Sequence, residues 1–307
     1  ATAVSAASVS AADLPRSARL TTACPLLDAA LHGGLRTRAV HEIVGESNCG
    51  KTQLCLQLLL TCQWGRQHGG LGCKSLYINT EGSGGMTTSR LREMLAFHHA
   101  KGHSSADAMD NIFIQQGASD PESLMSILAR AKALMDQHNV RLVVIDSIAN
   151  AFKDVLSSEG RPSDALYRIM NLLKRYASEY DACVVLTNHV SDHIEDSAVH
   201  RATKRAEVPL HTSGRRVKAS LGMGFAQSVT CRYFVSRLHG IRLNEREYDT
   251  SGCVRAFAVV FSPFQGIRDT NYIINQSGVW GIPDEVIKEA DREPLASPIM
   301  EGGHHHG

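Results

Sequence analysis

Apolar residues between positions 39 and 187 follow two alternating patterns. Short runs rich in Val, Ile and Leu are typical of buried strands, and the longer segments between them have apolar residues three and four positions apart, which predicts helices. The strands are predicted at 39–44, 75–80, 111–115, 141–146 and 182–187. The helices are predicted at 51–66, 88–101, 121–138 and 163–180. Strands that alternate with helices predict a mostly parallel sheet with helices on both faces.

The pattern changes after residue 220. Strand-like runs at 228–238, 254–262 and 271–275 follow one another with turns between them. Such runs are typical of hairpins, so we expect them to form an antiparallel extension at the C-terminal end of the same sheet. The predicted fold class is therefore α/β.

Domain boundaries are predicted near the two ends of the chain. No internal repeat or low-complexity linker divides the middle, so we expect one domain at 21–288. Residues 1–20 are expected to be a linker remnant or the cut edge of a longer protein. Residues 289–307, which end in Gly-Gly-His-His-His-Gly, are expected to be a tail that includes a tag.

Two segments lack a sustained periodicity. Residues 150–162 follow the fourth predicted strand, and residues 191–218 follow the fifth. Loops of this length inside a compact domain are usually functional. Open α/β sheets bind ligands at the carboxyl ends of their strands, so the pattern predicts a ligand site at this edge of the sheet.

Composition excludes several classes of protein. The 307 residues include 32 Lys or Arg and 31 Asp or Glu, so contact with nucleic acid would need a local basic patch. No apolar run approaches the ~18 residues that a membrane span needs, so we expect no membrane partner. The eight cysteines form no CxxC pair, which excludes a zinc ribbon, and several lie in apolar runs, as in proteins of the cytosol or nucleus.

The strongest motif is a GxxxxGK[ST] phosphate-binding loop between a predicted strand and a predicted helix. Its glycines allow backbone N–H groups to surround the phosphates of ATP, and its lysine supplies positive charge to the β- and γ-phosphates in binding and catalysis. A glycine turn that only begins a helix is the alternative interpretation. The motif comprises Gly45, Glu46, Ser47, Asn48, Cys49, Gly50, Lys51 and Thr52.

Two acidic residues end predicted strands near this loop. Asp146 follows four apolar residues, and together with the Thr52 hydroxyl it is expected to hold Mg²⁺. Glu81 follows Thr80 at the end of the second predicted strand, where a carboxylate can orient or deprotonate the water that attacks ATP. A solvated glutamate at a strand end is the alternative for Glu81.

Basic residues gather in the second aperiodic segment, where Glu207 is the acidic residue among them. They predict contacts to the phosphates of DNA, and a solvated loop is the equally plausible alternative. Two further basic residues in the first segment would extend the same surface. The predicted DNA-facing residues are Lys153, Arg161, Arg201, Lys204, Arg205, Arg215, Arg216 and Lys218.

These motifs together resemble the RecA/RadA recombinase family. The resemblance rests on the phosphate-binding loop followed by Gln53, on Thr80-Glu81-Gly82, on residues 142–147, and on Thr187-Asn188. Finer matches resemble the eukaryotic recombinase paralogues, and the likeness covers about residues 20–285. These finer matches lie at 24–28, 33–35, 66–71, 141–147 and 216–217.

The resemblance implies a RecA-like P-loop ATPase core that uses ATP and Mg²⁺. It implies that Gln53 belongs to the nucleotide site, that Arg90 packs near the adenine, and that Pro263 caps the nucleotide of a neighbouring protomer. It further implies a nuclear protein of homologous-recombination DNA repair, paired with a second recombinase paralogue. Such a pair binds single-stranded or branched DNA, hydrolyses ATP slowly and supports the main recombinase filament.

The chain departs from the family pattern at two points. The family's small helical N-terminal domain is expected to be absent, and the pair after the fifth predicted strand is Asn188-His189 where the family has Asn-Gln. His189 is expected to act as the nucleotide sensor in place of the glutamine. A nearby phosphate would favour a protonated imidazole, so nucleotide binding or loop ordering is expected to weaken between about pH 6 and pH 8. A histidine bonded within the loop and insensitive to nucleotide is the alternative.

Three functions remain open on sequence grounds. The first is an enzyme whose slow ATP hydrolysis drives assembly and release. In the second, ATP binds at a subunit interface and only holds it together. The third is a RecA-like motor of another pathway.

Overall fold

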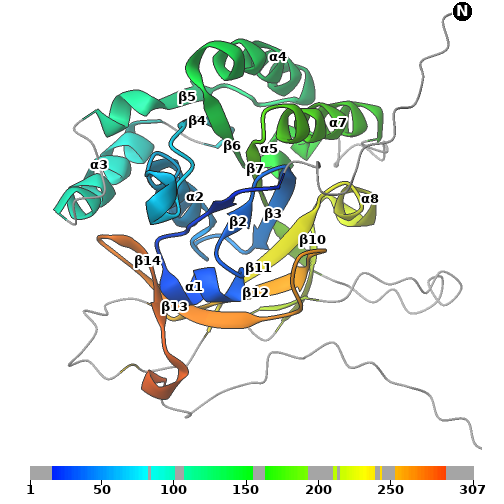
Figure 1. The fold of residues 1–307 in the computed structure, drawn as a ribbon. Coiled ribbons are helices and arrows are strands. Elements are labelled where there is room, and N and C mark those ends of the chain that lie inside the picture. The colour runs from blue at the N-terminus through cyan, green and yellow to red at the C-terminus, as the bar shows by residue number, and fades with distance from the viewer. Residues whose placement is uncertain are drawn as a thin grey trace, which may run out of the picture.

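The centre of the molecule is a parallel sheet, as the alternating pattern predicts. The computed structural model describes residues 16–81, 84–100, 107–154, 163–192, 210–212, 215–238, 243 and 253–287. The central strands are β3 (Ala39–Gly45), β4 (Lys74–Asn79), β5 (Ile112–Gln116), β6 (Val140–Asp146) and β7 (Cys183–Asn188). They pair in parallel in the order β3-β7-β6-β4-β5 (Figure 1). Their carboxyl ends therefore lie along one edge, where Val44 is beside Asn188 and Asn79 is beside Asp146.

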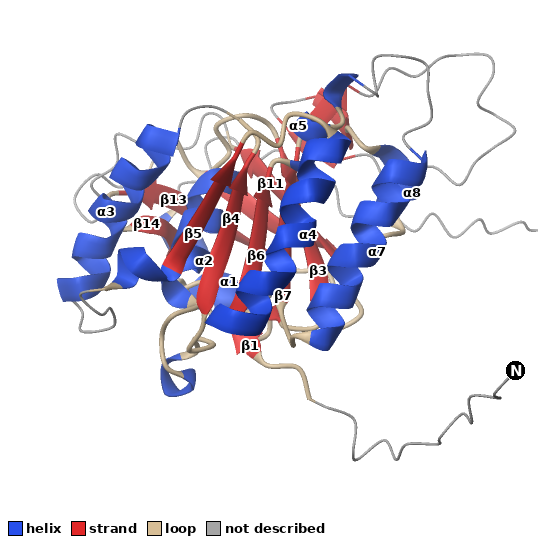
Figure 2. Cartoon of the chain, turned by 90° about the horizontal axis from the view of Figure 1, so that it is seen from above, coloured by secondary structure: helices blue, strands red, loops and turns tan. Residues whose placement is uncertain are grey.

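Helices cover both faces of this sheet (Figure 2). Helices α2 (Lys51–Thr61) and α3 (Gly84–Ala100) cover one face, and α4 (Pro121–His138) and α7 (Ser163–Glu179) cover the other. Because successive residues of a strand point to opposite faces, Tyr77 packs in the core under α2, whereas Leu76 and Ile78 pack under α4. Helix α2 is shorter than the predicted 51–66 segment, since the chain turns at Cys62.

The C-terminal strands extend the sheet beyond β3. They are β11 (Cys231–Arg237), β12 (Arg255–Phe261), β13 (Asp269–Asn275) and β14 (Gly278–Ile282). Within the described residues the complete sheet has nine strands, in the order β14-β13-β12-β11-β3-β7-β6-β4-β5. Strand β11 pairs antiparallel with β12, as predicted for the run at 228–238, and it also pairs in parallel with β3, which joins the extension to the central sheet. The predicted α/β fold with a C-terminal antiparallel extension is confirmed.

The described residues of the segment 191–218, which lacks a sustained periodicity, belong partly to a small second sheet. Strands β8 (Val190–Asp192), β9 (Leu210–Thr212) and β10 (Arg215–Ala219) pair in the order β8-β10-β9. Strands of three to five residues are too short to give a periodic signal. Val217 and Ala219 are buried against Val44 and Phe234, so the small sheet packs on the large one beside the end of β3.

The remaining elements are short. They are β1 (Arg19–Leu20), β2 (Leu35–Arg36), α1 (Pro25–Ala30), α5 (Ile148–Ala151), α8 (Gly222–Ala226), and the 3₁₀ helices η1 (Arg66–His68), η2 (Ala108–Asn111) and η4 (Asp284–Val286). All eight cysteines are free thiols, and seven of them are buried, as the apolar context predicts. None of the helices in the described part of the chain has both the length and the apolar character of a membrane span.

Candidate nucleotide-binding site

The phosphate-binding loop joins the end of β3 to the start of α2. Gly45 lies so close to β11 that an added Cβ would be 2.2 Å from the Val235 carbonyl oxygen. Gly50 has a φ of +97° and faces Ile274, which an added Cβ would approach to 2.6 Å. Both positions therefore require glycine for local packing as well as for phosphate access.

Lys51 is folded back onto the loop. Its Nζ donates hydrogen bonds to the Gly45 carbonyl at 2.8 Å and to the Glu46 carbonyl at 2.9 Å. Burial lowers the pKa of Lys51, because the charged form loses its hydration. The two carbonyl contacts hold the ammonium group at the floor of the loop.

Asp146 stands at the end of β6 among three hydroxyl groups. Thr52 and Tyr77 donate to its Oδ2 at 2.7 and 2.9 Å, and Thr187 donates to its Oδ1 at 2.5 Å. The pKa of Tyr77 is raised, first by burial and then by the charge of Asp146. A carboxylate and a threonine hydroxyl side by side are ligands suited to Mg²⁺, which usually binds one or two protein oxygens together with substrate phosphates. The residues thus fit the predicted metal.

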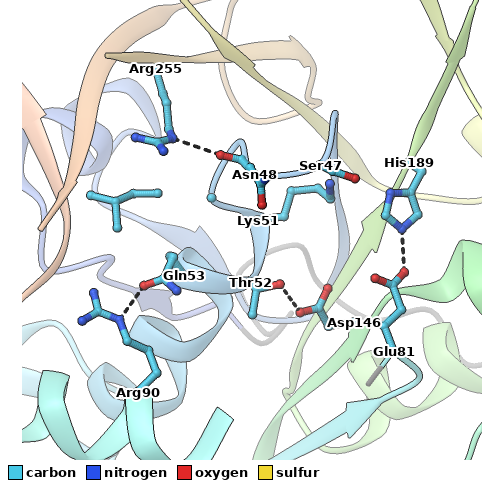
Figure 3. A pocket seen from close by; sticks show the side chains of 12 residues that line it. Ser47, Asn48, Lys51, Thr52, Gln53, Glu81, Arg90, Asp146, His189 and Arg255 are labelled. Carbon is cyan, nitrogen blue, oxygen red and sulfur yellow. Dashed lines mark hydrogen bonds and ion pairs between the residues drawn. The ribbon is translucent and has the colours of Figure 1, made fainter. Parts of the chain in front are cut away.

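Glu81 lies in a second hydrogen-bonded group beside this carboxylate. Its Oε1 accepts hydrogen bonds from Ser147 Oγ at 2.5 Å and from His189 Nε2 at 2.6 Å. The His189 contact, helped by Ser147, lowers the pKa of Glu81 to about 2, although partial burial opposes the shift. His189, predicted as a nucleotide sensor, therefore contacts the predicted water-activating residue directly (Figure 3).

Arg90 projects from α3 to the other end of the site. Its Nε donates to Gln53 Oε1 at 2.7 Å, and its Nη2 donates to the Asn275 carbonyl at 2.5 Å. An ion pair of 2.9 Å with Glu93 further fixes the guanidinium. These contacts fix the Arg90 guanidinium at the edge of the cavity, and its expected position beside the adenine stays a prediction.

One cavity of about 650 Å³ connects these groups (Figure 3). This volume lies in the range of cofactor-binding pockets. Arg255 from β12 and Ile274 from β13 also line it, and sequence reasoning missed both of them. Neither residue belongs to a motif. The sequence indicated only that each lies in a predicted strand of the extension. The residues lining the cavity are Ser47, Asn48, Gly50, Lys51, Thr52, Gln53, Glu81, Arg90, Asp146, His189, Arg255 and Ile274.

The residues predicted to face DNA differ in their surroundings: some are exposed, one is held in ion pairs, and others lie outside the described part of the chain. Arg215 contacts Glu46 Oε1 at 2.5 Å and Asp192 Oδ1 at 3.0 Å, so the structure places it in ion pairs between the small sheet and the loop. Side chains of Lys153, Arg216 and Lys218 are exposed, and so is that of Pro263 in the turn after β12. The other predicted DNA-facing residues lie outside the described part of the chain: Arg161, Arg201, Lys204 and Arg205.

The fold and the loop together define a P-loop protein of the RecA type. Residues 16–229 match the Rad51 family model, and the chain belongs to this family of RecA-like ATPases. It is 33% identical over 292 residues to the "DNA repair protein XRCC3 homolog" of Arabidopsis thaliana, which covers 87% of this chain and 94% of that protein. It is 30% identical over 278 residues to the "DNA repair protein XRCC3" of Mus musculus, covering 86% of this chain and 76% of that protein. The predicted relation to the recombinase paralogues is confirmed.

Proposed function

We propose that this chain is a Mg-ATP-binding recombinase paralogue of homologous-recombination DNA repair, which acts in the nucleus as a heterodimer with a second paralogue. Its DNA ligand would be single-stranded or branched, and the heterodimer would support the main recombinase filament. The observation that carries the proposal is the convergence of Lys51, Thr52, Asp146 and Glu81 on one cavity. The names of the two relatives support the pathway.

Each of these residues has a role that its position supports. Lys51 would exchange its loop carbonyls for the β- and γ-phosphates, as the lysine of such loops does. Thr52 and Asp146 would hold Mg²⁺, which supplies charge neutralisation at the phosphates. Glu81 would orient the attacking water and accept its proton. The helix α2 directs its N-terminal N–H groups at the same place.

The low pKa of Glu81 supports slow hydrolysis. A carboxylate with a pKa of about 2 is a poor proton acceptor near neutral pH, since general bases work best when their pKa is near the working pH. The same observation favours a second candidate, in which ATP holds a subunit interface together without being turned over. The Glu81→Gln variant separates the two functions: heterodimer formation and repair that persist without hydrolysis favour the second.

ATP binding itself is tested with Lys51→Ala, studied by isothermal titration. The variant is expected to fold and to lose ATP binding, because the Lys51 ammonium in the wild type bonds two loop carbonyls and, among the described residues, no side chain of the hydrophobic core. At a Mg-ATP concentration a hundred times the dissociation constant, the free energy of unfolding of the wild type should rise by about 2.7 kcal/mol. That of the variant should not change. Lys132→Ala on α4, an exposed lysine paired with Asp136, is the matched control. Unchanged ATP affinity in folded Lys51→Ala would refute the assignment.

A further inference from the structure

Arg255 is a cation of the cavity that comes from the antiparallel extension. It begins β12, and its side chain reaches the phosphate-binding loop, where Nε lies 3.3 Å from the Asn48 carbonyl oxygen (Figure 3). Its Nη1 donates to the Cys253 carbonyl at 2.6 Å. Within the described part of the chain, Nη2 makes no hydrogen bond, so one edge of the guanidinium keeps donors for a ligand.

The extension holds Arg255 firmly at this position. In the pairing of β12 with β13, Arg255 lies opposite Tyr272, whose hydroxyl donates to the Cys49 carbonyl at 2.5 Å. The neighbouring Ile274 packs on Gly50. The strand pair therefore contacts three consecutive residues of the loop, and the arginine is placed by strands and not by a mobile segment.

The other two Lys or Arg side chains that line the cavity, Lys51 and Arg90, also make hydrogen bonds within the protein. Lys51 donates to two loop carbonyls, and Arg90 donates to Gln53, Glu93 and the backbone of β13. Asp146 and Glu81 bring negative charge to the side of the cavity away from Arg255 (Figure 3). A guanidinium with a free edge matches the oxygens of a phosphate group, so Arg255 is suited to an anion in this cavity.

We propose that Arg255 binds the polyphosphate chain of the nucleotide in cis, as a second phosphate-binding cation beside Lys51. The proposal rests on the proposed function in that it takes the cavity to be the ATP site. Nucleotide binding would then connect the antiparallel extension to the loop through the ligand. Arg255 would be a binding residue that no motif in the loop predicts.

Three variants separate phosphate binding from support of the loop. Arg255→Gln keeps an N–H that can reach the Asn48 carbonyl and loses the charge. Arg255→Lys keeps the charge and loses the planar fork. Arg268→Gln removes an exposed arginine from the turn between β12 and β13, where residue 268 pairs with Val259 at the far end of β12 from Arg255, and it is the matched control. All are titrated with ATP, ADP and inorganic tripolyphosphate by calorimetry, and their melting temperatures are measured without ligand.

Arg255→Gln is expected to weaken binding of all three ligands about 10- to 100-fold, the range for a lost hydrogen bond to a charged group, with an unchanged melting temperature. Arg255→Lys should recover part of the loss, and Arg268→Gln should bind as wild type does. Wild-type affinity in Arg255→Gln, while Lys51→Ala loses ATP, overturns this inference and leaves the proposed function standing. Equal losses in the Gln and Lys variants with lowered melting temperatures also overturn it, because they indicate support of the loop. Absence of ATP binding in the wild type overturns both.

Discussion

A buried ion pair beneath the nucleotide site offers a quantitative test of the fold. Glu42 on β3 is fully buried, and Arg232 on β11 is 4% exposed. Arg232 Nε donates to Glu42 Oε2 at 2.6 Å, and Asn188 at the end of β7 donates to Glu42 Oε1 at 2.7 Å. One carboxylate therefore joins three neighbouring strands, and it lies three residues before the phosphate-binding loop begins.

Removing one partner leaves the other charge buried, which costs about 3–5 kcal/mol. Domains are stable by about 5–15 kcal/mol, so the loss is a large share of the total. For a domain of this size it corresponds to a fall in melting temperature of roughly 6–20 °C. We expect Arg232→Met and Glu42→Gln each to show a loss of this order, and the double variant to lose much less than their sum.

Urea unfolding of the wild type, both single variants and the double variant closes a double-mutant cycle. Lys132→Met on α4 is the control, because the Lys132–Asp136 pair lies in solvent and its loss should change stability little. The reasoning fails if Arg232→Met costs less than about 1 kcal/mol. It also fails if the two single losses simply add, since the two side chains would then not be coupled.

Two further predictions concern the site and the small sheet. His189→Ala removes the hydrogen bond that is the largest cause of the low pKa of Glu81. The carboxyl should then titrate closer to 4.5 than to 2 in an NMR titration, and an unchanged value contradicts the assigned cause. Because that pKa is depressed, the stability that Glu81 contributes is present above about pH 4.5 and is lost as the pH falls to about 2, and His189→Ala should reduce this loss. If the chain binds DNA as proposed, Lys218→Gln should flatten the slope of log affinity against log salt by about one contact. Arg215→Gln should flatten it by less, because Arg215 already pairs with Glu46, and equal changes would place both on phosphate.

Local patterns were sufficient to predict the central sheet and the core of the site. Lys51, Thr52, Asp146 and Glu81 each follow or end a strand whose apolar pattern is clear, and parallel strands bring their carboxyl ends together. The predicted helix at 121–138 coincides with α4, since Asp120 caps it and Pro121 begins it. In these cases the signal lies within a few residues of the feature.

The missed features depend on contacts between distant parts of the chain. The basic cluster predicts that Arg215 contacts DNA phosphate, and it does not reveal the ion pair that Arg215 forms with Glu46, 169 residues earlier in the chain. Arg255 reaches Asn48 across 207 residues, and no motif records that approach. Charge and periodicity describe neighbours in sequence, so they do not reveal which opposite charge a side chain meets after folding.

The residues at the variable positions of the loop make contacts between the loop and other parts of the molecule. In GxxxxGKT the fixed residues serve phosphate and metal, which leaves four positions without a required chemistry. In this chain Glu46 binds Arg215 of the small sheet and lies 3.8 Å from Arg237 of β11, while the Asn48 and Cys49 carbonyls accept hydrogen bonds from the β12–β13 pair. Three of the four variable positions therefore contact elements outside the parallel core. A shift of the loop on binding nucleotide would act on the small sheet, on β11 and on the β12–β13 pair, through residues that the motif itself does not specify.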